Sequence, residues 1–263
     1  MQTRHRDKQL YFNEQVYTTE KYVIPFISKV LKISPELNIL EIGCGEGGNL
    51  KPFLDLGCSI TGIDLSESKI NNAIKFFSQH PNTDKAHFIT KDIYLAEDVL
   101  NTEFDLIIMR DVIEHIHNQE LFMGYVKRFL KPGGVFFLAF PPWYNPFGGH
   151  QQVANSKILS KLPYFHLFPK NIYRFILKAG GETQEKIDGF LEIKDTGISI
   201  ERFRKIVKQH GYHIITETMF FINPNYNIKF GLKPRKQISI FTAIPFFRNF
   251  VVTACYYLIK VKD

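Results

Sequence analysis

Cysteine is scarce in this sequence, and the few cysteines present show no paired spacing. The 263 residues contain Cys44, Cys58 and Cys255, with no C-x-x-C pair among them. An odd number without that spacing excludes a disulfide framework and the usual cysteine zinc and redox motifs. The first residues, Arg4 among them, are charged and polar and lack the apolar core of a secretory signal. We therefore expect a cytoplasmic protein in a reducing compartment.

The sequence also lacks an uninterrupted apolar run long enough to span a membrane. Residues 238–261 are rich in apolar side chains, but Pro245, Arg248 and Asn249 interrupt them. Charged and polar residues near the middle of a span are costly in lipid, so we do not expect a spanning helix here. With 44% hydrophobic residues, the chain has enough apolar material for a sizeable globular core.

Positive charge is present in excess and is unevenly distributed. The formal net charge is +7, and residues 223–263 carry seven Lys and Arg residues against one Asp. Phenylalanine and isoleucine are interspersed with these charges, a combination that favours an acidic partner or a membrane surface. We prefer the simpler interpretation of a solvated rim around a core hairpin, with peripheral membrane contact left open. Nucleic acid is not an expected partner, because no nucleic-acid-binding module accompanies the charge.

A glycine-rich segment between a strand and a helix carries the strongest functional signal. Asn38 to Ile42 is a short apolar strand, and helical spacing follows the glycines. Gly43, Gly45 and Gly48 fit the pattern G-x-G-x-x-G, in which a nucleotide cofactor approaches the backbone closely. Asp64 ends the next strand, where an acid suits two ribose hydroxyls. This pattern alone does not separate a nicotinamide cofactor from S-adenosylmethionine.

Three further motifs occur in order along residues 38–140. Glu41 stands before the first glycine and gives E-x-G-x-G-x-G; the strand Phe104 to Met109 is followed by RDVIEH at 110–115; and LKPGG at 130–134 leads into the strand Val135 to Phe140. On these motifs the chain resembles the class I S-adenosylmethionine-dependent methyltransferases. The resemblance implies that S-adenosylmethionine is the cofactor and that the activity is methyl transfer.

The resemblance also implies where the cofactor binds. Gly43, Gly45 and Gly47 are implied to line the methionine and ribose, Asp64 to bind the ribose hydroxyls and Asp92 to face adenine. The implied cofactor residues are Glu41, Gly43, Cys44, Gly45, Gly47, Asp64, Leu65, Asp92, Ile93, Arg110 and Asp111. Alternatively, Asp64 and Asp92 cap helices that begin near Glu67 and Tyr94.

The expected fold is α/β, with a Rossmann-like, doubly wound sheet of seven strands. Residues 212–222 and 251–261 are rich in β-branched and aromatic residues and are predicted as a terminal antiparallel hairpin. We expect an N-terminal helical flap (1–37), the S-adenosylmethionine-binding core (38–140), an inserted lid over the acceptor site (141–198) and a C-terminal helix and hairpin that complete the sheet (199–263). The connection 223–249 is long enough to cover the site.

Three histidines are candidates for a general base, because imidazole titrates near neutral pH. We prefer His150, which follows the fifth strand at the expected acceptor position, over His115 and His166. Asp111, Glu114 and His115 have the spacing i, i+3 and i+4 of one helical face. They resemble the E-x-x-E-H metal element of ubiquinone-type O-methyltransferases. We assign no metal, because this chain has Asp at the first position and the same pattern fits Asp111 as a helix cap with His115 beside the cofactor.

Two other functions compete with methyl transfer. A nicotinamide-dependent oxidoreductase of the short-chain type needs Tyr-x-x-x-Lys after the fourth or fifth strand, but here the pattern occurs at Tyr17 with Lys21 and at Tyr256 with Lys260. A non-catalytic S-adenosylmethionine-binding protein would keep the same loops. We expect an enzyme that methylates a small molecule at oxygen, with the acceptor and the oligomeric state left open.

Overall fold

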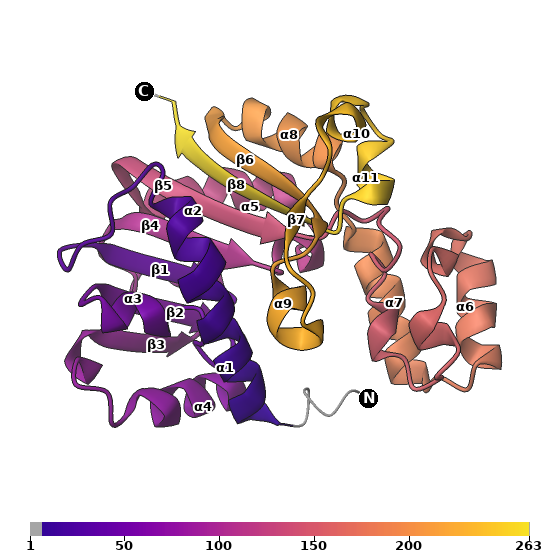
Figure 1. Cartoon of the computed structure of the whole chain (residues 1–263). Coiled ribbons are helices and arrows are strands. Elements are labelled where there is room, and N and C mark those ends of the chain that lie inside the picture. The colour runs from indigo at the N-terminus through magenta and orange to yellow at the C-terminus, as the bar shows by residue number, and fades with distance from the viewer. Residues whose placement is uncertain (1–6, 263) are drawn as a thin grey trace.

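A computed structural model describes residues 7–262; residues 1–6, which hold the charged start of the sequence, and Asp263 lie outside that range. Within it, eight strands form one sheet in the order β3-β2-β1-β4-β5-β8-β6-β7 (Figure 1). The strands are β1 (Asn38–Ile42), β2 (Ser59–Asp64), β3 (Ala86–Thr90), β4 (Phe104–Arg110), β5 (Leu130–Phe140), β6 (Tyr212–Ile222), β7 (Arg235–Lys236) and β8 (Ala254–Val261). The pairs among β1 to β5 are parallel, and β8 lies antiparallel between β5 and β6.

The predicted doubly wound α/β sheet with its antiparallel C-terminal strands is confirmed, with a correction to the strand number. We predicted seven strands, whereas β7 adds an eighth, two-residue strand at the edge beside β6. Two residues carry no periodic pattern that a sequence could reveal. The last strand also begins at Ala254 instead of residue 251, because Arg248–Val251 forms a short helix, α11.

Helices cover both faces of the sheet. One face packs against α5 (Gln119–Val126) and α8 (Ile200–Gln209), and the other against α1 (Lys8–Thr18), α2 (Ile24–Ile27), α3 (Lys51–Asp55) and α4 (Glu67–Phe77). Successive side chains of a strand point to opposite faces, so one strand can serve two cores. On β5 the side chains that face the first layer are Phe136, Leu138 and Phe140, and those that face the second are Val135, Phe137 and Ala139. The sheet is therefore buried on both faces, as its near-continuous apolar strands indicate.

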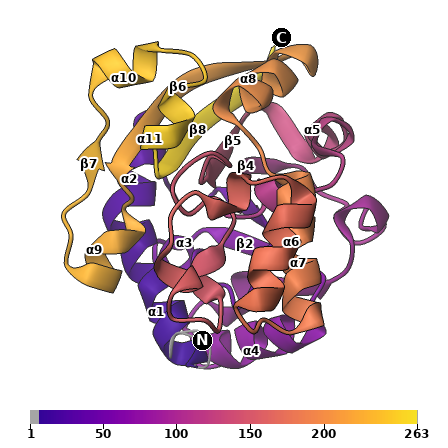
Figure 2. The same cartoon turned by 90° about the vertical axis from the view of Figure 1, so that its right-hand side faces the viewer.

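Residues 141–198, which we predicted as an insertion, leave the sheet where β5 ends. They contain α6 (Lys170–Ala179) and α7 (Gln184–Thr196), which pack around the buried side chains of Phe165 and Tyr173 in a small core of their own. Figure 1 shows this helical unit beside the main body, and in Figure 2 it faces the viewer. Its action as a lid stays a prediction.

The end of α7 fixes the insertion to the segment that follows β4. The Thr196 hydroxyl donates a hydrogen bond to the Glu114 carbonyl oxygen at 2.6 Å. The Gln119 amide of α5 donates to the Thr196 carbonyl oxygen, also at 2.6 Å. The insertion is therefore held to the backbone that carries Glu114.

The connection from β6 to β8 passes through α9 (Asn225–Phe230), the edge strand β7, α10 (Ser239–Ala243) and α11. Because β5 and β6 both run antiparallel to β8, β6 ends at the same edge of the sheet as β5. The connection therefore starts at the edge where the glycine-rich segment lies. Over residues 7–262, no helix combines the length and the apolar character that a membrane crossing requires.

Candidate active site

The glycine-rich loop leaves β1 and folds back toward β2. The backbone N–H groups of Gly43 and Cys44 donate to the Ile63 carbonyl oxygen at 2.8 and 3.1 Å. Gly43 and Gly45 have φ angles of +72° and +55°, a region that favours glycine. A Cβ atom added at Gly45 would meet no protein atom nearer than Lys69 Cδ at 4.0 Å. The loop therefore presents open space to one side, which a ligand can occupy.

Asp64, at the end of β2, ties this loop to the next helix. Its Oδ2 accepts a hydrogen bond from Gly45 N–H and its Oδ1 accepts one from Ser66 N–H, each at 2.9 Å. A carboxylate has about four acceptor sites, so each oxygen retains one for a ligand. The residue at the N-cap of α4 is Ser66, and Asp64 is not the cap that we considered as an alternative.

Asp92 has a capping role and also faces the cavity described below. Its Oδ1 accepts a hydrogen bond from Tyr94 N–H at 3.0 Å, which caps the short 3-10 helix Ile93–Leu95. The capping alternative is therefore confirmed for Asp92. A ligand role is compatible with it, because the second carboxylate oxygen is left for other donors.

A buried polar chain lies beneath the loop. Asn49 donates from Nδ2 to Glu41 Oε1 at 2.6 Å, and Arg110 donates from Nη1 to Asn49 Oδ1 at 2.7 Å. Arg110 Nη2 continues the chain to the side-chain oxygen of Asn225 in α9. Burial raises the pKa of Glu41 to about 8, against the lowering effects of Asn49 and Arg110. Glu41 is therefore a neutral hydrogen-bonding group near pH 7 that supports the loop from behind.

A cavity of about 910 Å³ opens over the loop. This volume is near the upper end of the range of about 300–1,000 Å³ for small-molecule pockets. Its wall contains eight of the eleven predicted cofactor residues, namely Gly43, Gly45, Asp64, Leu65, Asp92, Ile93, Arg110 and Asp111. Among the described residues 7–262, the other three predicted cofactor residues, Glu41, Cys44 and Gly47, do not line the cavity. Cys44 Sγ instead packs against Gly62 of β2, and Gly47 lies against Phe77 and Phe88.

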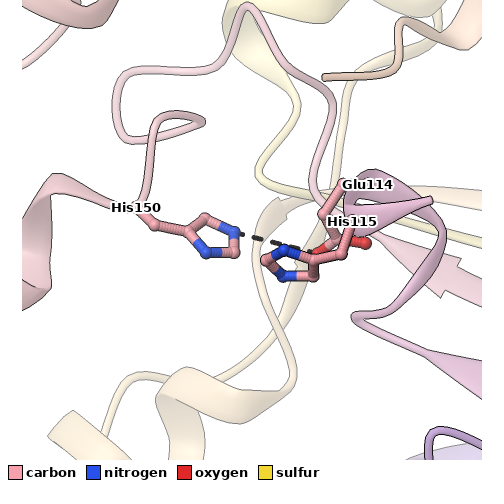
Figure 3. Close-up of side chains that lie close together, drawn as sticks. All are labelled: Glu114, His115 and His150. Atoms are coloured by element: carbon pink, nitrogen blue, oxygen red, sulfur yellow. Dashed lines mark ion pairs between the residues drawn. The ribbon is translucent and has the colours of Figure 1, made fainter. Parts of the chain in front are cut away.

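The predicted histidines fall into different surroundings. His115 lies on the cavity wall, and the ring of His150 packs against it with 5.1 Å between ring centroids. His150 comes from the insertion and does not line the cavity in the described part of the chain. Its Nε2 is 3.8 Å from Oε1 of Glu114 (Figure 3). Mainly through burial, the pKa of His150 is lowered to about 4 and that of His115 is lowered as well. Both rings are therefore neutral at neutral pH.

Glu114 lies buried beside these two rings. Neither carboxylate oxygen accepts a hydrogen bond from the described residues. Burial first, and the charge of Asp111 second, raise the pKa of Glu114 well above its ordinary value. Together, Glu114, His115 and His150 offer ligand or proton-transfer atoms within 4.8 Å of one another.

Two of our predictions for this region need correction. Asp111, Glu114 and His115 do not share a helical face, because Asp111 has a left-handed φ of +55° and only Ile113–His115 form a short 3-10 helix. His166 is fully buried, and its ring nitrogens contact the Trp143 carbonyl oxygen at 2.9 Å and the Gln151 side chain at 3.2 Å. Its surroundings indicate a packing role, and we do not retain it as a candidate base.

The N-terminal segment contributes cavity residues that we had not assigned. α1 crosses the glycine loop so closely that a Cβ atom at Gly48 would lie 2.7 Å from the Phe12 carbonyl oxygen. The wall residues from α1 are Lys8, Tyr11, Glu14, Gln15 and Thr18, and α9 adds Asn225 and Lys229. The sequence pointed to these residues only indirectly, through the predicted N-terminal helical flap and the long connection expected to cover the site.

Comparison with known proteins decides the cofactor that the glycine pattern had left open. Residues 12–163, more than half of the chain, match the family described as "Methyltransferase domain". The chain belongs to this family. Membership of the family makes S-adenosylmethionine, and not a nicotinamide nucleotide, the cofactor of this methyltransferase.

The curated relatives match part of the methyltransferase. Ubiquinone biosynthesis O-methyltransferase of Bartonella tribocorum is 31% identical over 125 residues, which cover 47% of this chain and 49% of the relative. The mitochondrial ubiquinone biosynthesis O-methyltransferase of Rattus norvegicus is 35% identical over 105 residues, which cover 39% and 30% of the two chains. The chain therefore spans half or less of the length of these relatives.

Solved structures resemble the methyltransferase over nearly its whole length. Geranyl diphosphate C-methyltransferase from Streptomyces coelicolor A3(2) aligns with a TM-score of 0.57 at 13% identity and covers 92% of this chain and 79% of its own. An S-adenosylmethionine-dependent methyltransferase from Clostridium acetobutylicum aligns with a TM-score of 0.56 at 14% identity, over 94% and 92%. At such identities the likeness establishes the fold.

Proposed function

We propose that this methyltransferase transfers the methyl group of S-adenosylmethionine to an oxygen atom of a small, amphipathic acceptor, with His115 as the general base. The observation that carries the proposal is the position of His115 on the cavity wall, next to His150 and the buried Glu114. The names of the partly matching relatives, which are O-methyltransferases of ubiquinone biosynthesis, support an oxygen acceptor.

The cofactor site follows from the same wall. Asp64 binds the ribose hydroxyls through the acceptor sites that Gly45 and Ser66 leave open, and Gly45 leaves room for the methionine part. Asp92 accepts a hydrogen bond from the adenine amino group. The open space over Gly45 and the carboxylates at the ends of β2 and β3 fit a zwitterionic adenosine derivative.

The reaction is an in-line displacement at the methyl carbon. When bound, the sulfonium supplies the methyl group and leaves as a neutral thioether. As the new O–CH₃ bond forms, the acceptor hydroxyl loses its proton to His115, whose neutral ring is ready to receive it. His150 supports the ring of His115 through their contact and acts as a positioning residue.

The proposal is tested with S-adenosylmethionine that is labelled in its methyl group. The purified chain is incubated with a catechol, a simple phenol, an aliphatic amine and a carboxylic acid, and the products are identified by mass spectrometry and NMR. We expect label in an O-methyl ether of the catechol or phenol. Transfer to the amine alone would contradict methylation at oxygen.

Loss of the His115 imidazole should slow turnover without weakening the binding of the cofactor. We expect His115→Ala to lower kcat by about 10²–10⁴-fold, the usual contribution of a general base, with an unchanged Kd for S-adenosylhomocysteine. His150→Ala should also spare binding, slow turnover less and move the acid limb of the pH profile of kcat. His213→Ala is the matched control, because this exposed ring lies on β6 and does not line the cavity. Equal kcat values for all three variants would rule out His115 as the base.

Methyl transfer should not require a metal ion. Glu114, His115 and His150 are close enough to bind one cation together, so a metal requirement has to be tested at this site. We expect full activity after treatment with EDTA and no gain on addition of Mg²⁺, because the displacement needs alignment and a base. Loss of activity with EDTA that Mg²⁺ restores would assign these side chains to a metal.

A further inference from the structure

The connection 223–250, which we name the arm, exposes large apolar side chains. Phe246 is 69% exposed, Ile240 64% and Ile238 62%. The other exposed apolar residues of the arm are Ile228, Phe230, Leu232, Phe241, Ile244, Phe247 and Phe250. Soluble proteins seldom leave so many large apolar groups together in water, and such a patch marks an interaction surface. The arm is therefore more than the solvated rim that we preferred from the sequence.

A buried anchor holds the arm in this conformation. Glu201 of α8 accepts hydrogen bonds from Arg248 Nε at 2.8 Å, from Asn249 Nδ2 at 2.5 Å and from Phe246 N–H at 2.9 Å. Phe246 itself has a φ of +63°, which is unfavourable for a bulky residue. The anchor thus keeps Phe246 pointed outward at an energetic cost.

All charged side chains of the arm are positive. Lys233, Arg235 and Lys236 are exposed, and residues 223–262 contain no Asp or Glu. Exposed aromatic and aliphatic groups beside Lys and Arg suit an anionic lipid surface, which takes the apolar groups into its interface and the cations at its headgroups. A second copy of the chain is disfavoured, because a two-fold contact would bring these like charges together.

The arm also borders the cavity. Asn225 and Lys229 of α9 line it, and Arg110 on the cavity wall bonds to Asn225. The gold ribbon in Figure 2 runs from α9 through β7 to α10 along one side of the molecule. From this combination we infer that the arm docks the methyltransferase on anionic membranes, with the cavity near the lipid surface.

Vesicle sedimentation tests the inference. The full chain is mixed with vesicles of phosphatidylcholine alone or of phosphatidylcholine with phosphatidylglycerol. We expect binding to the anionic vesicles that falls as salt is added. Ile240→Ser with Phe246→Ser should weaken it about tenfold or more, and so should Lys233→Gln with Arg235→Gln and Lys236→Gln.

The matched control changes similar residues at the other end of the sheet. Ile74→Ser with Lys75→Gln alters an exposed isoleucine and lysine on α4, which lies far from α10 in both views (Figures 1 and 2). This variant should bind vesicles as the unchanged chain does. Each variant is also checked for its melting temperature and for S-adenosylhomocysteine affinity, both of which should be unchanged.

Several outcomes would overturn the inference. These are equal binding to neutral and anionic vesicles, arm variants that bind as well as the α4 control, and a dimer in solution that the arm variants disperse without any vesicle binding. Retention on heparin without vesicle binding would assign the arm to nucleic acid instead. None of these results bears on the acceptor or on His115, so the inference and the proposed function fail separately.

Discussion

Asp64→Ala is expected to weaken the binding of S-adenosylmethionine by at least about 100-fold, because the two ribose hydroxyls each lose a hydrogen bond to a charged group worth about 1.5–3 kcal/mol. The variant also releases the N–H groups of Gly45 and Ser66, so the loop loses its tie to the helix that follows β2. Isothermal titration with S-adenosylhomocysteine measures the effect.

Two controls separate the ligand contact from general damage. Asp64→Asn keeps the shape and one acceptor oxygen, so an intermediate affinity is expected. Asp195→Ala removes an exposed carboxylate that pairs with Lys170 outside the cavity, and its affinity should be unchanged. If Asp64→Ala bound the ligand within about threefold of the unchanged chain, a difference below 1 kcal/mol, the site assignment would be wrong.

Gly45→Val is expected to remove cofactor binding while the protein still folds. The new side chain would meet open space in the protein, since the nearest atom is Lys69 Cδ at 4.0 Å, and would fill the room that the ligand needs. Its left-handed φ of +55° adds a strain of about 1–3 kcal/mol. Titration calorimetry and urea unfolding measure the two effects separately.

Gly181→Val is the matched control for backbone strain. Gly181 has a φ of +80°, has no atom within 4 Å of an added Cβ and lies in the turn between α6 and α7. Both variants should therefore lose a similar free energy of unfolding, and only Gly45→Val should lose the ligand. Retained binding in Gly45→Val would show that the ligand does not pass over this glycine.

Local patterns predicted the central part of the fold and several residues of the cavity wall. The glycine loop, the acid at the end of β2 and the apolar strands depend on neighbours in sequence, so their spacing is informative. Gly43, Gly45 and Asp64 accordingly fall together on the cavity wall. Burial could not be predicted in the same way. The sequence does not distinguish a fully buried histidine such as His166 from a histidine that lines the cavity.

The features that the sequence did not predict are contacts between distant residues and one unusual backbone dihedral angle. His150 reaches His115 and Glu114 only through the path of the insertion, and Gln15 joins the cavity only because α1 crosses the glycine loop. The expected helical face failed at Asp111, whose positive φ ends any regular helix at that point. No residue type in that segment predicts the left-handed backbone conformation at Asp111.

The hydrogen bond from Thr196 to the Glu114 carbonyl joins the helices of the insertion to the peptide that carries His115. We therefore expect a graft that exchanges residues 141–198 for the equivalent part of another methyltransferase to move His115 as well as to change the insertion. If the insertion acts as the predicted lid, this hydrogen bond links acceptor selection to the position of the proposed base.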